Sequence, residues 1–406
     1  MSNALTRSFQ LYKNAYTGHP REVWTIFFMT LINRMGTMVL LFLTVYLTTV
    51  LNFTLPEAGL LAGAFGLGSL SGSYLGGKLT DRIGANHVIT GSLFLGGLML
   101  ISLQFATAFA SLYALIFTMA LFGEAYRPAM TASVADFVPP SKTGRTMAFI
   151  RLAINLGMTA APGIGGFIAA TLGYKYLFWI DGLTCITAAV YFWLRSRKWE
   201  KRVHTTETEA ELAAKATARP PQKNRLYLQF LLASFLLGFC FIQWFQSVPV
   251  FIKTEWGYDE RYIGIIMALS CVLVTLVEMP LIDSIEKSNK IQAATLIGLV
   301  LIALSFLPFL LPKALWLCFL GITLLTMGEI LVLPFNSSIP LNMSPAGKRG
   351  EYMAWYWMSW SLTHVLGPTI GLTFASAFGF PAFWLALCGL VGLSWLLHWR
   401  LADRIF

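Results

Sequence analysis

The sequence predicts an all-α membrane protein of twelve transmembrane helices, arranged as two six-helix bundles related by pseudo-symmetry. Of its 406 residues, 56% are hydrophobic and only 12% are charged, and the mean hydropathy is +0.66. So little polar surface cannot keep a globular domain in solution. The apolar residues form runs of about 20, enough for a helix to cross a hydrocarbon core of about 30 Å. Such runs are too long for the alternating strands of a membrane barrel.

Twelve of these apolar runs follow one another along the chain, separated by short polar connections. We expect the first to be retained, because it follows a polar stretch, exceeds the apolar core of a signal peptide and has no small-residue cleavage site behind it. The predicted spans are residues 23–50, 57–77, 87–107, 110–132, 146–172, 176–195, 226–252, 261–282, 290–311, 314–335, 350–376 and 380–399.

The basic residues predict the orientation of the helices. With twelve spans, both termini and every second connection lie on one side, and that side carries most of the 29 Lys and Arg. The positive-inside rule therefore predicts that both termini are cytoplasmic, in the inner (plasma) membrane. We therefore attribute the net charge of +10 to the basic residues that set the orientation of the helices. Nucleic acid binding is not expected, because no soluble basic domain is present to carry it. The basic residues of the opposite side are Lys175, Lys253, Arg261 and Lys313.

A long polar stretch divides the chain into two halves. Residues 1–194 are predicted to form the N-terminal bundle, 195–225 a cytoplasmic linker, and 226–406 the C-terminal bundle. Within the linker, TETEAELAAKATA could form a short surface helix that ends at the following prolines. A solvated tether near anionic headgroups and a regulatory element are both compatible with this composition.

The two halves resemble each other in sequence. The stretch GRTMAFIRLAINLGMTAAPGIG from Gly144 matches GEYMAWYWMSWSLTHVLGPTIG from Gly350 without a gap. A repeat inserted in the same sense implies two bundles related by an axis along the membrane normal. Such an arrangement can open to either side of the membrane at the bundle interface.

The connection after the second span carries a short charged motif, GGKLTDRIG, with Gly77, Asp81, Arg82 and Gly84. It resembles the loop motif of the major facilitator superfamily, and the likeness to that family extends over essentially the whole chain. The resemblance implies that the aspartate belongs to a conformational latch, in which a carboxylate near a helix N-terminus gains about 0.3–1 kcal/mol. The basic pair that usually follows the last glycine is missing here. An ordinary tight hairpin is the alternative.

The fifth span carries a second motif with Gly157, Pro162, Gly163, Gly165 and Gly166. It resembles the antiporter signature of drug and proton exchangers in the same superfamily, which implies export. Proline removes a backbone donor and kinks a helix, while glycines permit close helix packing. The repeat partner in the eleventh span also has a Gly-Pro pair, so part of this motif can be shared architecture.

Several ionisable side chains lie in the middle of predicted spans, where a charge costs some 2.5–3.5 kcal/mol on insertion scales and therefore indicates function. Glu124 and Arg127 are three residues apart, share one helix face and can pair. Glu329 has no cation in its own helix, which favours it as the proton carrier, with Arg34 or Arg127 as electrostatic partner. Static pairs that hold the bundles together are the alternative. Two other carboxyls lie nearer helix ends, where hydration explains them: Asp181 and Glu278.

Aromatic and amide side chains in the seventh and eleventh spans predict the cargo. Such surfaces suit an amphipathic or aromatic small molecule and disfavour a small polar sugar. Part of the set could instead face lipid or form interfacial belts. The candidate substrate-binding residues are Gln243, Trp244, Gln246, Tyr356, Trp357 and Trp360.

These features predict a secondary active transporter that exports its cargo in exchange for protons. The alternative is a proton-coupled importer of short peptides or another small organic solute, because the run from Asn33 to Thr49 and GEILVLP loosely resemble the peptide-transporter branch. That branch's paired first-helix glutamates are replaced here by Thr30 and Asn33. A receptor or assembly subunit that keeps the fold without transporting is a third class.

The remaining expectations concern what the chain lacks. It carries no P-loop, metal-ligand cluster or nucleophile triad, so neither an enzyme nor an ATP-driven pump is expected, and no cofactor or metal. The five cysteines all lie in apolar runs, where they pack as small hydrophobes. Protons, the lipid bilayer and a small-molecule cargo are the expected partners of a monomer.

Overall fold

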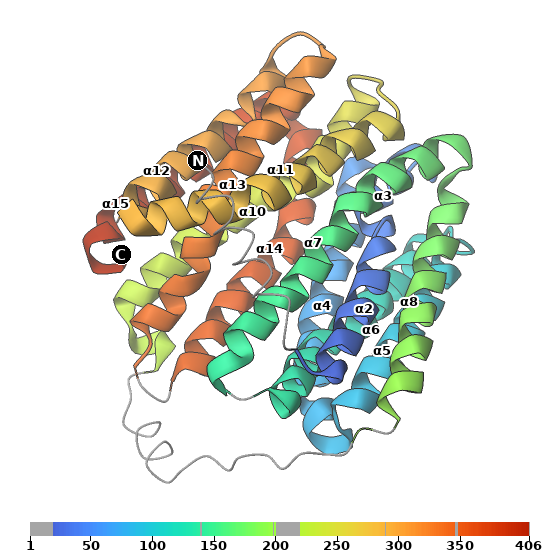
Figure 1. Ribbon diagram of the computed structural model, residues 1–406. Coiled ribbons are helices and arrows are strands. Elements are labelled where there is room, and N and C mark those ends of the chain that lie inside the picture. Colours follow the sequence, from blue (N-terminus) through green and yellow to red (C-terminus); the bar gives the residue numbers. More distant parts are fainter. Residues whose placement is uncertain are drawn as a thin grey trace, which may run out of the picture.

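The fold is a bundle of long helices that run back and forth across the molecule (Figure 1). The computed structural model describes residues 19–138, 140–197, 199, 220–288, 290–345 and 348–405. The described residues contain no strand. Each of the twelve predicted spans corresponds to a helical segment of the structure, which confirms the all-α fold class. The predicted helix within the linker lies outside the described residues.

The N-terminal half forms one bundle, blue to green in Figure 1. Its first predicted span is broken into two helices, because the chain leaves helical hydrogen bonding between Met35 and Val39. The helices of this half are α2 (Arg21–Met35), α3 (Val39–Thr49), α4 (Leu55–Ile83), α5 (Ala85–Leu103), α6 (Phe109–Phe137), α7 (Pro140–Thr171) and α8 (Tyr174–Ser196).

The C-terminal half forms the second bundle, yellow to red, beside the first (Figure 1). It begins with the short 3₁₀ turn η1 (Pro221–Lys223) and includes a second turn, η2 (Leu307–Leu310), that extends one span. Its helices are α10 (Arg225–Thr254), α11 (Glu260–Ser288), α12 (Ile291–Leu304), α13 (Leu315–Met343), α14 (Arg349–Phe378) and α15 (Phe380–Ile405).

Ten of the helical segments are long and apolar enough to cross a membrane by length and composition. The segments α4 and α14 are just as long, at 29 and 30 residues, but are not among these ten. Both contain many Gly, Ser and Thr, and they pack against each other. Contact with a protein neighbour explains why their composition is less apolar than that of a lipid-facing helix. That α4 and α14 also cross the membrane, and so bring the number of spans to twelve, remains a prediction.

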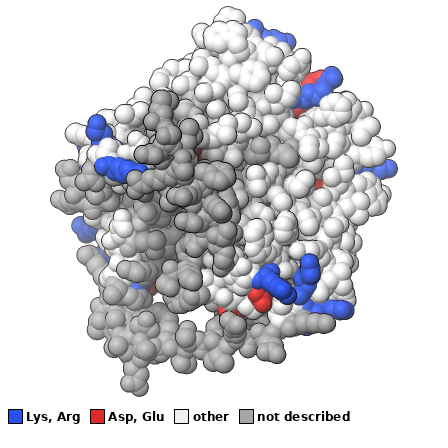
Figure 2. Space-filling view, viewed as in Figure 1, with Lys and Arg blue, Asp and Glu red and all other residues white. Residues whose placement is uncertain are grey.

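The described surface is poor in charge. Figure 2 shows a face on which most of the described residues are neither basic nor acidic. Large apolar side chains are exposed along the helices, among them Leu276 at 67%, Phe167 at 59% and Ile297 at 56%. An apolar exterior of this kind is costly in water and favourable in lipid.

We call the end of the molecule where α8 ends and α10 begins the linker end, and the opposite end the far end. The two bundles meet along a seam made by α4 with α14 and by α7 with α11, and α3 reaches α10 at the far end (Figure 1). At the seam, a Cβ on Gly59 would lie 2.6 Å from the Pro368 carbonyl oxygen, and Thr369 Oγ1 donates to the Gly59 carbonyl at 3.1 Å. The backbones therefore touch near the far end.

Candidate functional site

The N-terminal bundle holds one charged cluster at mid-depth, made by α2 and α6. Arg127 Nε lies 2.6 Å from Glu124 Oε2, so the two side chains form the pair that their spacing predicts. Arg34, only 8% exposed, donates a hydrogen bond from Nη2 to the hydroxyl of Tyr126. Its Nε is buried and has no hydrogen-bond partner among the described residues. This cluster places three of the four predicted coupling residues together within one bundle.

The fourth, Glu329, belongs to a second cluster at the seam. Arg151 Nη2 of α7 lies 3.3 Å from Glu278 Oε1 of α11, so this ion pair joins the two bundles. Both groups lie within electrostatic range of the Glu329 carboxyl on α13. Among the described residues, Glu329 itself makes no hydrogen bond or ion pair. An ionised Glu329 thus places a second negative charge beside one arginine.

This second cluster corrects two sequence expectations. The cation beside Glu329 is Arg151, and neither Arg34 nor Arg127 takes that place. Glu278 is held by a protein partner rather than by hydration alone, and only 13% of its side chain is exposed. Sequence reasoning missed the pair because its members are 127 residues apart and lie on different bundles.

The members of both clusters lie at similar depth. At 1.5 Å per residue, Arg34, Glu124, Arg151, Glu278 and Glu329 are all roughly 15–21 Å along their helices from the linker end. In transporters built from repeats, binding and coupling sites lie near the middle of the membrane at the interface of the repeats. The clusters are thus at the depth where coupling chemistry is expected.

The motif of the fifth span lies on α7, which packs against two neighbours. A Cβ on Gly166 would lie 2.3 Å from the Glu260 carbonyl oxygen of α11, whereas one on Gly163 would lie 3.6 Å from Ala268 Cβ. The carbonyl oxygen of Pro162, on α7, faces Gly264 of α11. This side of the motif forms the seam between the bundles.

The other side of the motif packs within the N-terminal bundle. A Cβ on Gly157 would lie 2.5 Å from Arg34 Cβ, and one on Gly165 would lie 3.0 Å from Met38 Cβ. The motif therefore lets α7 approach both the first span and the opposite bundle. This is the close packing that its glycines predict.

The predicted latch lies at the linker end, where α4 passes into α5. Gly84 adopts φ +88° between the two helices, a conformation that other residues rarely take. Arg82 is exposed in the last turn of α4, and a Cβ on Gly77 would meet nothing within 4 Å. Asp81 lies in the same turn, and its side chain is outside the described part of the structure. The latch role stays a prediction.

Two candidate cargo residues are packed inside the C-terminal bundle. Gln243 is fully buried; its Nε2 donates to the carbonyl of Gly367 at 2.9 Å and its Oε1 accepts from Ser247 at 2.6 Å. Trp244, also fully buried, donates from Nε1 to Ser305 Oγ at 3.0 Å. Their polar groups join α10 to its neighbours, which leaves none of them free for cargo in this conformation.

The other four candidates differ in exposure. Gln246 is 5% exposed, and its Oε1 has no hydrogen-bond partner among the described residues. Trp360 is partly exposed, with its ring 6.1 Å from that of Phe241. Tyr356 is 2% exposed, in an aromatic core, whereas Trp357 is 55% exposed. The role of these four side chains in cargo binding stays a prediction.

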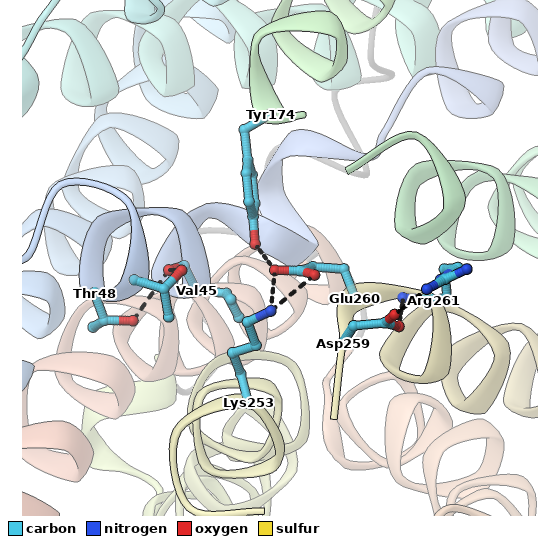
Figure 3. A network of polar contacts seen from close by, with 8 residues as sticks. Val45, Thr48, Tyr174, Lys253, Asp259, Glu260 and Arg261 are labelled. Carbon is cyan, nitrogen blue, oxygen red and sulfur yellow. Dashed lines mark hydrogen bonds and ion pairs between the residues drawn. The ribbon is translucent and has the colours of Figure 1, made fainter. Parts of the chain in front are cut away.

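A polar network closes the far end across the two bundles (Figure 3). Tyr174, the first residue of α8, donates its hydroxyl to Glu260 Oε1 of α11 at 2.6 Å. Lys253 of α10 approaches the same carboxyl group from the opposite side, with Nζ 3.0 Å from Oε1 (Figure 3). Glu260 is 5% exposed. No sequence pattern predicted this network, because its residues lie at or near helix ends and come from both halves.

We predict that Tyr174→Phe weakens this closure. A buried hydrogen bond to a charged group contributes about 1.5–3 kcal/mol, so its loss should shift the balance toward a far-end-open conformation by roughly tenfold or more. Distances between spin labels on the far ends of the two bundles measure that shift. Tyr258→Phe is the matched control, because the Tyr258 ring lies near Lys313 in the same region. Unchanged far-end distances in Tyr174→Phe would contradict the role of its hydroxyl.

All five cysteines are free, and the described residues contain no group of three or more His, Cys, Asp or Glu that could hold a metal ion.

Comparison with known proteins agrees with this architecture. The family model described as Major Facilitator Superfamily matches residues 26–368. The chain is 25% identical over 343 residues to the multidrug resistance protein MdtH of Edwardsiella ictaluri, covering 81% of each chain. It is 22% identical over 393 residues to a Na(+), Li(+), K(+)/H(+) antiporter of Planococcus maritimus, covering 89% of this chain and 92% of the relative.

The same fold occurs in solved structures. The crystal structure of the peptide transporter POT in complex with sulfate superposes with a TM-score of 0.78 at 16% identity, and the match covers 96% of both chains. The named relatives are transporters, which points away from an enzyme. Because the family model spans most of the sequence and the helices form two packed bundles, the chain belongs to the Major Facilitator Superfamily and is a multi-pass membrane transporter.

Proposed function

We propose that the protein exports an amphipathic or aromatic small molecule in exchange for protons, by alternating access between its two bundles. The observation that carries the proposal is the position of Glu329 beside the Arg151–Glu278 pair, which links α7 to α11 across the seam. A group that binds a proton at this place can change the force between the bundles.

The charge balance of the seam cluster gives the physical reason. With both carboxyls ionised, one arginine faces two negative charges; its side chain is 59% exposed and that of Glu278 is 13% exposed. A proton on Glu329 leaves a neutral set in which Arg151 pairs with Glu278 alone. A change of one charge within this set alters the attraction between α7 and α11 and so biases an equilibrium between two conformations.

The export direction is supported by the fifth-span motif and by the relatives. Gly163 and Gly166 of the motif lie at the seam, where an exchanger would need close packing of the bundles. Two relatives are named as a multidrug resistance protein and as an antiporter that uses protons. The aromatic surface of Trp360 and Phe241, with the unpartnered oxygen of Gln246, suits a cargo that has a ring and a hydrogen-bond donor.

The proposed cycle places both termini in the cytoplasm of a cell with a plasma membrane energised by protons. The described conformation would then be closed to the outside by the Tyr174–Glu260–Lys253 network. A proton from outside neutralises Glu329. Cargo binding then favours release of that proton to the cytoplasm. Each charge moved gains about 2.3 kcal/mol per 100 mV of membrane potential, in addition to the pH gradient.

Transport by purified protein in liposomes tests the direction. A panel of aromatic and amphipathic compounds is screened for thermal stabilisation, and those that bind are loaded for flux with an imposed pH gradient. Export predicts that cargo moves against the flow of protons, and a proton ionophore should abolish the uphill movement. Movement of cargo together with protons would instead support the importer of peptides or other solutes. Binding without proton flux would contradict both.

A further inference from the structure

The break in the first span is held by a carboxyl group of a different helix. Asp181 of α8 is 4% exposed, and its Oδ2 accepts from the backbone N–H of Met38 at 3.1 Å and of Val39 at 2.7 Å. The side chain thus caps the N-terminus of α3 from outside the segment. This corrects the expectation that Asp181 is simply hydrated. Gly36 permits the approach, since a Cβ there would lie 2.9 Å from Asp181 Oδ1.

The charge of Asp181 matters for this cap. The first N–H groups of a helix have no partner within it and carry a partial positive charge, so an anion stabilises them better than a neutral group. Arg34, in the turn before the break, lies within electrostatic range of the same carboxyl. Asp181 is therefore attracted by both halves of the first span, the end of α2 and the start of α3.

The half-helix α3 also reaches the opposite bundle at the far end. Thr44 Oγ1 donates to the carbonyl of Gln246 on α10 at 3.0 Å, and it is fully buried. The ring of Tyr46 lies 5.3 Å from that of Tyr174, which in turn bonds to Glu260. Since Asp181 and Tyr174 both belong to α8, this helix holds the start of α3 and closes the far end.

We propose that Asp181 is a positioning residue for transport: its negative charge fixes the direction of α3 at the break. It thereby keeps Thr44 against α10 of the C-terminal bundle, and Tyr46 against Tyr174, which bonds to Glu260 of that bundle. Without that charge, the remaining side-chain oxygen accepts the two backbone N–H groups more weakly, and α3 turns more freely about residues 36–38. The far-end-closed state then loses stability relative to the open one. The inference rests only on the alternating access of the proposed function, and neither on protons nor on export.

The test uses Asp181→Asn, which keeps the size of the side chain and removes its charge. Spin labels at Val50 and Leu311, both exposed at the far end of different bundles, report far-end opening; labels at Ile83 and Arg400 report the linker end. Measurements are made in lipid nanodiscs without cargo or gradient, in a background whose five cysteines are replaced by alanine. Asn33→Ala is the matched control, because Asn33 is buried on α2 beside position 185 of α8, one turn from Asp181, and makes none of the hydrogen bonds of the cap.

We expect Asp181→Asn to raise the ratio of far-end-open to far-end-closed molecules at least about fivefold, the lower range of coupling between sites. Asn33→Ala should leave the ratio unchanged. A folded Asp181→Asn variant with the distances of its background would overturn the proposal. So would an equal shift in Asn33→Ala, which would indicate general loosening.

Hydrogen exchange of the wild type provides a second measurement, should the variant fail to fold. The amides of Met38 and Val39 are expected to be protected like the interior of α3. Exchange at the rate of a free loop would refute the cap. Failure of proton exchange in the transport assay leaves this outcome untouched, so the two proposals can fail separately.

Discussion

Replacement of Glu329 by glutamine is expected to abolish uphill transport while cargo binding persists. Glutamine has nearly the same shape but cannot exchange a proton, so Arg151 would face Glu278 alone at every pH. Flux driven by a pH gradient should fall to the level of empty liposomes. The cargo Kd should change by less than about threefold, which corresponds to roughly 0.7 kcal/mol. Exchange of labelled for unlabelled cargo should continue.

Glu124→Gln is the comparison variant for that experiment. Glu124 is bound to Arg127 within the N-terminal bundle, at 2.6 Å, and has its own cation. Its loss leaves a cation unpaired, so it should weaken transport but retain the dependence on the pH gradient. Normal gradient-driven flux in Glu329→Gln, or loss of the dependence only in Glu124→Gln, would move the coupling role to the N-terminal cluster.

Substitution of Gly166 by alanine should disrupt the seam between α7 and α11. The new Cβ would lie 2.3 Å from the Glu260 carbonyl oxygen and 3.0 Å from Gly264 Cα, both of them backbone atoms that cannot rotate away. The helices must separate, at a cost of about 1–3 kcal/mol. Because Glu260 also holds the far-end network, we expect lower thermal stability in detergent and a transport rate reduced by roughly tenfold or more.

Gly163→Ala provides the control within the same motif. Its Cβ would lie 3.6 Å from Ala268 Cβ, an ordinary van der Waals distance, and alanine favours a helix more than glycine does. We expect normal transport and equal or slightly higher stability. Equal effects of the two substitutions would mean that the motif acts through something other than close packing at the seam.

Sequence reasoning predicted the helices well because the membrane imposes one simple rule. Backbone polar groups must be satisfied inside each segment, so a run of apolar residues long enough to cross lipid becomes a helix. Pairing within a helix is equally local, and the spacing of Glu124 and Arg127 was sufficient to predict their ion pair.

The candidate cargo residues show where composition was insufficient. Gln243 and Trp244 looked like cargo ligands because amides and indoles are rare in lipid-facing helices. In the structure they satisfy the polar groups of neighbouring helices inside the C-terminal bundle. A buried side chain that joins two helices and one that faces a substrate have the same amino-acid types, and only the packing around each distinguishes them.

The sequence by itself determined the all-α fold class, the family and the motif glycines, because each of these follows from neighbours along the chain. The tertiary structure decided which charges meet: Arg151 with Glu278 and Glu329, and Asp181 with the break in the first span. These contacts join helices far apart in sequence. Their existence depends on the rotation and depth of each helix in the bundle, and the periodicity of a single segment contains neither.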